Sequence, residues 1–168
     1  MPFITLRHGC LASLALASVG PVEAGSASGS LQVTATVLSA CAVTGATLPF
    51  GNLDPVTTSG AVNASATLSV HCTNTTAYAV ALDAGLNAGG AANFSARRLS
   101  NGSSTLDYQL YRDAARSIVW GDGSAATSTV QGTGNGSAQT LTVYGRIPAL
   151  GSAAPGAYTD TVTIVVTF

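Results

Sequence analysis

Short segments in which apolar and polar residues alternate run through most of this sequence, and they constrain its fold more than any other feature. Gly, Ser, Thr and Asn residues interrupt the segments roughly every 8–12 residues, the spacing expected of a sandwich of short strands. The alternating apolar positions are Leu68, Val70 and Cys72; Tyr78, Val80 and Leu82; Leu106, Tyr108 and Leu110; and Leu141, Val143 and Gly145. Because strand side chains point alternately to two faces, the pattern predicts an all-β protein with loops at 51–63, 84–96 and 121–137.

Residues 1–24 have the features of a secretory signal peptide. A short polar region precedes an apolar run at 10–19, and small or β-branched residues suited to signal-peptidase cleavage close the segment. The apolar run has about 10 residues, which is too short to cross a bilayer, so no membrane insertion is expected. We therefore expect an exported chain with an N-terminal extension at 25–40 and one domain at 41–168.

The charge balance argues against nucleic acids and membranes as partners. The sequence contains no lysine, and five arginines accompany six aspartates after residue 24. This composition supplies neither the basic stripe that binds nucleic acid nor the polybasic patch that binds anionic membranes. A surface that is polar but carries little charge suits a protein that packs closely against its own copies.

Two cysteines, Cys41 and Cys72, remain once the signal peptide is removed. In an oxidising compartment such a pair is expected to form one disulfide, and closing a loop of about 31 residues would stabilise the fold by roughly 3–4 kcal/mol in the chain-entropy model. A metal site has little support, because there is no Cys-x-x-Cys motif and His71 is the sole histidine after residue 24. His71 lies at a polar position of an alternating segment, which argues against a catalytic triad. We expect no enzyme activity and no cofactor.

The two ends of the mature chain each carry an alternating segment. In residues 157–168 the apolar face consists of Tyr158, Val162, Ile164, Val166 and Phe168. Near the other end, directly after a flexible Gly/Ser stretch, the apolar face consists of Leu31, Val33, Ala35 and Val37. Exposed edge strands usually carry Lys, Pro or a bulge that prevents further pairing, and no such device follows Tyr158. The two segments could pair within one chain or between neighbouring chains, and the pattern leaves both possibilities open.

Several motifs in a fixed order resemble the spore coat protein U domain family, which includes the shaft pilins of archaic (Csu-type) chaperone–usher pili. The segments that carry the resemblance are 108–116 (YQLYRDAAR), 119–123 (VWGDG), 141–148 (LTVYGRIP) and 155–162 (PGAYTDTV). The early Cys-x-Val and the terminal Thr-Phe fit as well, so the resemblance covers essentially all of residues 30–168.

The resemblance implies an incomplete immunoglobulin-like β-sandwich that is completed by donor-strand complementation, an established form of β-augmentation. The donor side chains would be Leu31, Val33, Ala35 and Val37. The acceptor groove would be lined by Val162, Ile164, Val166 and Phe168. The implied partners are identical or homologous pilin subunits, a periplasmic chaperone and an outer-membrane usher. The implied location is a fimbrium on the cell surface, and the family disulfide corresponds to Cys41 and Cys72.

The sequence predicts a structural pilin that polymerises for adhesion or biofilm formation, in a shaft or adaptor position because it has one domain and a donor extension. Two other interpretations stay open. One is a spore or cell coat protein, since the domain also occurs in such proteins. The other is a monomeric secreted carbohydrate-binding module in which residues 31–37 close their own sheet.

Overall fold

The protein consists of two units, Met1–Thr36 and Val37–Phe168. The computed structural model describes residues 20–151 and 153–168. In the first unit, residues 20–36 have no regular secondary structure and their side chains are exposed. Residues 1–19 of the predicted signal peptide lie outside the described residues. The strands and the hydrophobic core of the described chain belong to the second unit.

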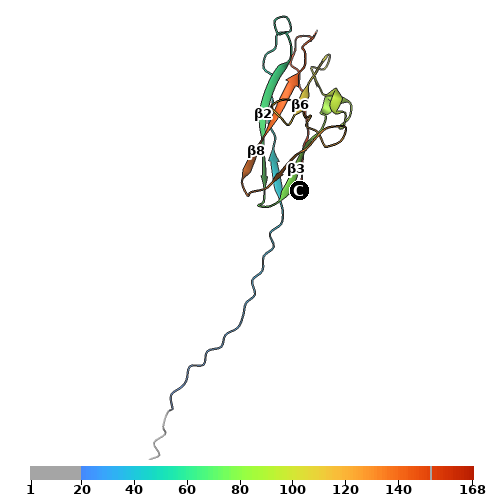
Figure 1. Ribbon diagram of the computed structural model, residues 1–168. Coiled ribbons are helices and arrows are strands. Elements are labelled where there is room, and N and C mark those ends of the chain that lie inside the picture. Colours follow the sequence, from blue (N-terminus) through green and yellow to red (C-terminus); the bar gives the residue numbers. More distant parts are fainter. Residues whose placement is uncertain (1–19, 152) are drawn as a thin grey trace, which may run out of the picture. The chain divides into compact units, whose positions relative to one another are not determined.

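Four strands of the second unit form an antiparallel sheet in the order β1-β2-β8-β6 (Figure 1). They span Cys41–Thr44 (β1), Val62–Cys72 (β2), Ala138–Ile147 (β8) and Gln109–Tyr111 (β6). Leu68 lies opposite Leu141, and Ala66 lies opposite Val143. Residues directly opposite each other in a sheet share a face, so this register places the apolar positions of β2 and β8 together on the core side.

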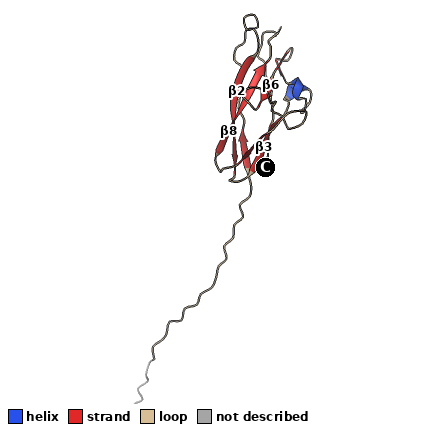
Figure 2. Cartoon of the chain, in the orientation of Figure 1, coloured by secondary structure: helices blue, strands red, loops and turns tan. Residues whose placement is uncertain are grey.

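A second antiparallel sheet has the order β7-β3-β9, and a small two-stranded sheet pairs β4 with β5 (Figure 2). These strands span Val130–Thr133 (β7), Ala77–Leu82 (β3), Ile164–Thr167 (β9), Arg98–Ser100 (β4) and Thr105–Asp107 (β5). Two short 3-10 helices, Leu86–Ala88 (η1) and Phe94–Ala96 (η2), lie between β3 and β4. The described chain contains no helix that is long and apolar enough to span a membrane.

Side chains from both larger sheets meet in one hydrophobic core. Its most deeply buried members are Leu68, Val70, Cys72, Val80, Leu82, Trp120 and Ile147. The indole Nε1 of Trp120 donates a hydrogen bond to the backbone oxygen of Val80 at 2.9 Å, so this large side chain is buried without an unpaired polar group. The alternation seen in the sequence is therefore the alternation of core and surface, and the all-β prediction is confirmed.

Two details of the sequence interpretation are corrected by the structure. The interval 121–137, predicted to be a loop, contains β7, which pairs with β3. Position 132 in this strand requires glycine, because the ring of Tyr78 lies against it and any Cβ there would collide with the ring. The C-terminal segment 157–168 alternates in exposure as predicted, but only Ile164–Thr167 forms a regular strand.

Candidate functional site

An apolar groove with a volume of about 1080 Å³ opens between two segments of the second unit, residues 46–55 and residues 153–162. Its floor consists of apolar side chains from all three sheets and of Leu150, which follows β8. They are Leu68, Leu82, Leu99, Leu106, Leu110, Val143, Ile147 and Leu150. Side chains of this kind normally lie beneath a covering segment, and here the groove leaves them accessible from outside.

The groove exists because the chain leaves the first sheet after β1. A Cβ at Gly45 would lie 3.9 Å from Cδ1 of Ile164, so the chain still passes close to the C-terminal strand at this point. Beyond it, residues 46–55 belong to no strand. Leu48 and Phe50 instead pack over Gly145 of β8, where a Cβ would approach both side chains to 2.9 Å. The two segments that border the groove therefore have no backbone pairing with each other.

The C-terminal segment forms one wall of the groove and keeps one backbone edge open. Thr159 exchanges hydrogen bonds with Ser100, and the backbone oxygens of Thr161 and Thr163 accept from Leu86 and Asp83 at 3.1 and 3.0 Å. Backbone groups of an extended chain point alternately to its two sides. The N–H and C=O groups of Asp160 and Val162 therefore point away from these partners, and neither residue has a backbone hydrogen bond within the described chain.

Tyr108 and Asp160 are hydrogen-bonded to each other in the groove lining, and we call this pair the polar subsite. The hydroxyl of Tyr108 donates to Oδ2 of Asp160 at 2.7 Å. Oδ1 of Asp160 accepts from the backbone N–H and the side-chain Nδ2 of Asn87 at 3.2 and 3.0 Å. Burial, together with the hydrogen bond to the Asp160 carboxylate, raises the pKa of the Tyr108 phenol well above its ordinary value. Tyr108 is therefore a neutral donor at any physiological pH.

A buried arginine, Arg97, is linked to the same wall through hydrogen bonds to Asp83. Arg97 is 1% exposed, and its guanidinium donates to Oε1 of Gln109 at 2.8 Å and to the backbone oxygens of Asp83 and Trp120 at 2.6 and 2.9 Å. Burial lowers the pKa of Arg97, and the nearby carboxylates of Asp83 and Asp160 partly offset this effect. Oδ1 of Asp83 in turn accepts a hydrogen bond from the backbone N–H of Thr163 at 2.8 Å. Because Arg97 bonds to the backbone oxygen of the same Asp83, it stabilises the turn to which the C-terminal wall of the groove is attached. No motif in the sequence marked this residue.

The predicted groove residues do not all lie in the groove. Val162 and Ile164 line it. Val166 packs against the core outside the groove, and Phe168 is 57% exposed. The reason is that β1 contacts β9 and already covers this end of the sheet. The apolar lining reaches instead toward Tyr158, at the other end of the segment.

The predicted donor residues are exposed and belong to no strand. Leu31, Val33 and Val37 are 88%, 82% and 89% exposed, and Ala35 is exposed as well. The groove is lined only by residues of the second unit.

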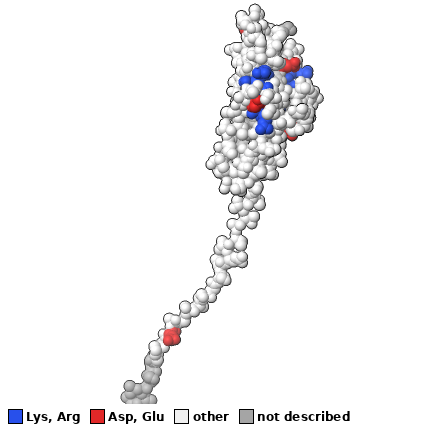
Figure 3. All heavy atoms as spheres, viewed as in Figure 1, with Lys and Arg blue, Asp and Glu red and all other residues white. Residues whose placement is uncertain are grey.

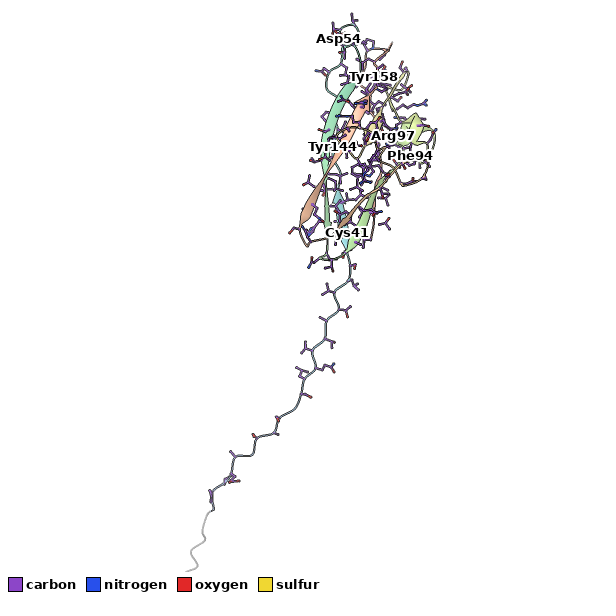
Figure 4. The ribbon with its side chains drawn as sticks, viewed as in Figure 1. Cys41, Asp54, Phe94, Arg97, Tyr144 and Tyr158 are labelled. Atoms are coloured by element: carbon purple, nitrogen blue, oxygen red, sulfur yellow. A yellow bond between two sulfur atoms is a disulfide. The ribbon has the colours of Figure 1, made fainter. Side chains whose placement is uncertain are left out.

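The disulfide between Cys41 and Cys72 is present, with the two residues directly opposite each other where β1 pairs with β2. It fastens the first strand of the domain to the sheet. Figure 4 shows Cys41 at one end of the domain and Tyr158, with Asp54 of the 46–55 segment, at the other.

The lining of the groove combines aliphatic side chains with a backbone edge that is open at Asp160 and Val162. The carboxylate of Asp160, at the polar subsite, accepts three hydrogen bonds. In the described part of the chain, no three His, Cys, Asp or Glu residues come together as metal ligands. Nε2 of His71 lies 3.2 Å from the backbone oxygen of Gly136, on the exposed face of β2.

Known proteins resemble this chain over most of its length. The model of the Spore Coat Protein U domain matches residues 27–165. Protein U of Myxococcus xanthus is 36% identical over 169 residues, covering 94% of this chain and 93% of that protein. A chain in the crystal structure of the CsuC–CsuE chaperone–tip adhesion subunit pre-assembly complex, from archaic chaperone–usher Csu pili of Acinetobacter baumannii, matches 79% of this chain with a TM-score of 0.55 and 23% identity. This chain spans 40% of the length of that solved chain, and at this identity the likeness concerns the fold alone.

Proposed function

The chain belongs to the Spore Coat Protein U domain family, and we propose that it is a non-enzymatic structural subunit that polymerises by donating residues 31–37 to the groove of a neighbouring copy. One observation carries the proposal. A sandwich with an open apolar groove and an unpaired backbone edge occurs in the same chain as an exposed segment with alternating apolar side chains. The incomplete immunoglobulin-like sandwich would then be completed by donor-strand complementation.

The energetics favour such an exchange. Burying the side chains of Leu31, Val33 and Val37 would contribute roughly 5–8 kcal/mol, and each added backbone hydrogen bond about 0.5–1.5 kcal/mol. This total is comparable to the net stability of a whole domain, about 5–15 kcal/mol. A subunit with an empty groove is therefore expected to be marginally stable, and a complemented subunit very stable.

The surface also suits close packing between copies. On the face shown in Figure 3, the charged side chains of the second unit gather in one region, and the rest of that face is uncharged. Little charge has to be desolvated when two such surfaces meet. In this proposal the partners are further pilin subunits, with a periplasmic chaperone that protects the groove and an outer-membrane usher that exports the fibre. The likeness to a chain of a chaperone–subunit complex supports this assignment, and the product would be a surface fimbrium.

A coat protein is the second candidate function. The observation that favours it is the similarity to Protein U, which extends over nearly the full length of both chains. The same strand exchange would serve either assembly.

The proposal is tested with the mature full chain and two matched variants. Val33→Asp places a charge on the inserted face of the donor, and Thr34→Asp places the same charge on its outward face. We expect wild-type protein and Thr34→Asp to form oligomers that resist SDS without boiling, whereas Val33→Asp remains monomeric. A synthetic peptide of residues 28–40 should then occupy the empty groove of the Val33→Asp monomer and raise its melting temperature. Strand donation would be contradicted if Val33→Asp formed the same oligomers as wild type, or if the peptide left the melting temperature of the Val33→Asp monomer unchanged.

A further inference from the structure

We propose that the polar subsite of Tyr108 and Asp160 determines the register of the exchanged strand by accepting Ala35, with the donor antiparallel to the C-terminal segment. This inference rests on the proposed function. It assigns Val33 to the position beside Val162 and identifies Ala35 and Asp160 as a specificity-determining pair.

The C-terminal wall of the groove and the donor segment each have four side chains that would face into the groove. The wall presents Tyr158, Asp160, Val162 and Ile164, each partly buried and lining the groove. The donor presents Leu31, Val33, Ala35 and Val37. With all four positions filled, an antiparallel donor places Ala35 beside Asp160, and a parallel donor places Val33 there and Ala35 beside Val162.

The chemistry of the polar subsite favours alanine. All three hydrogen bonds to the Asp160 carboxylate come from Tyr108 and Asn87 of the same subunit, so the carboxylate requires no partner from the donor. The ring of Tyr108, 6% exposed, fills the floor beneath it. A methyl group adds the least apolar surface beside a carboxylate, whereas a larger side chain would desolvate the carboxylate or displace the ring. The small donor residue and the shallow polar position are therefore complementary.

Chain connectivity favours the same orientation. Only residues 38–40 separate Val37 from Cys41, the first residue of the donor's own domain. Four residue steps of extended chain span at most about 14 Å. With the antiparallel donor, Val37 lies at the Tyr158 end of the acceptor, which Figure 4 shows at the far end from Cys41, so the domains follow one another head to tail. With the parallel donor, Val37 would lie beside Ile164, so the donor's own domain would have to fit within about 14 Å of the end where the acceptor's chain already passes at Gly45.

Cross-linking in the full chain distinguishes the two registers. Two double variants share the acceptor substitution Val162→Cys, one with Val33→Cys and one with Ala35→Cys. Both leave the polar subsite intact. We expect the Val33→Cys pair to form a covalent ladder on a non-reducing gel and the Ala35→Cys pair to form at least tenfold less. A ladder dominated by the Ala35→Cys pair would overturn the register while still supporting strand donation.

A size test addresses the subsite itself. Ala35→Leu enlarges the side chain that would meet Tyr108 and Asp160, and Val33→Leu enlarges its neighbour at an apolar position. We expect the Ala35→Leu peptide of residues 28–40 to bind the full-length Val33→Asp monomer roughly five- to 150-fold more weakly than the wild-type peptide, the range expected for overpacking. The Val33→Leu peptide should bind within a few fold of wild type. Equal binding by all three peptides would overturn the role of the polar subsite, whereas binding by none would overturn strand donation itself.

Discussion

Replacing Arg97 by lysine tests whether the buried guanidinium stabilises the domain and the groove wall. The guanidinium reaches three neutral acceptors, Gln109 Oε1 and the backbone oxygens of Asp83 and Trp120, and its central carbon lies 5.3 Å from the centre of the Phe94 ring. A lysine ammonium is a compact donor and cannot reproduce this planar fork. One or two of the acceptors would lose their partner inside the core.

The cost follows from those acceptors. A buried acceptor without a partner costs about 1–3 kcal/mol, so we expect Arg97→Lys to lower the free energy of unfolding by roughly 2–4 kcal/mol. The matched control is Arg98→Lys, because Arg98 is partly exposed and its Nε makes one hydrogen bond, to the backbone oxygen of Ala96 at 3.2 Å. That change should cost less than about 0.5 kcal/mol.

The free energies of unfolding must be measured on monomers, because strand exchange between copies would stabilise both variants and mask the difference between them. Urea unfolding is followed by tryptophan fluorescence in the Val33→Asp background saturated with the peptide of residues 28–40. Trp120 is fully buried and provides the signal. The peptide should also bind the Arg97→Lys variant more weakly than the Arg98→Lys variant, because Arg97 holds the turn at Asp83 that supports the wall. Equal stabilities for the two variants would refute the role assigned to Arg97.

Two further predictions concern the disulfide and the acid response. Replacing Cys41 and Cys72 by serine should lower the free energy of unfolding by roughly 3–4 kcal/mol, and dithiothreitol should lower the melting temperature of wild type but not of the double variant. The backbone N–H of Ile118 holds the pKa of the Asp113 carboxyl below its ordinary value of 3.8. The stability that Asp113 contributes is therefore present above pH 3.8 and lost as the pH falls through the lowered pKa. Asp113→Asn should thus lower the melting temperature at pH 7 and lower it progressively less as the pH falls below 3.8, and an effect that does not change with pH would contradict this assignment.

Much of the fold could be predicted because alternation reports burial directly. Leu68, Val70 and Cys72 are 2%, 0% and 0% exposed, as a strand with one face on the core requires. The prediction failed at β7, because Gly132 carries no side chain and cannot show alternation. Its place in the sheet follows from backbone pairing with β3, where Gly132 lies opposite Tyr78, and no local pattern reveals this partner.

The candidate site could be predicted only in outline. The alternation of the C-terminal segment identified Val162 and Ile164, which line the groove, but it also included Val166 and Phe168. Those two residues have the same pattern and differ only in their neighbours, because β1 contacts β9 at that end of the sheet. Local sequence contains no information about which strand from elsewhere in the chain lies alongside.

The sequence by itself determined which residues of β2 and β3 face the core, which two cysteines could pair, and that residues 31–37 and 157–168 have the alternation of strands. These properties depend on the identity of each residue and its immediate neighbours. Tertiary structure alone decided that Tyr108 meets Asp160, 52 residues away, that Arg97 lies beneath the groove wall, and that the groove ends where β1 begins to cover the sheet. Such contacts join residues distant in the chain, and they arise only when both sheets close on one core.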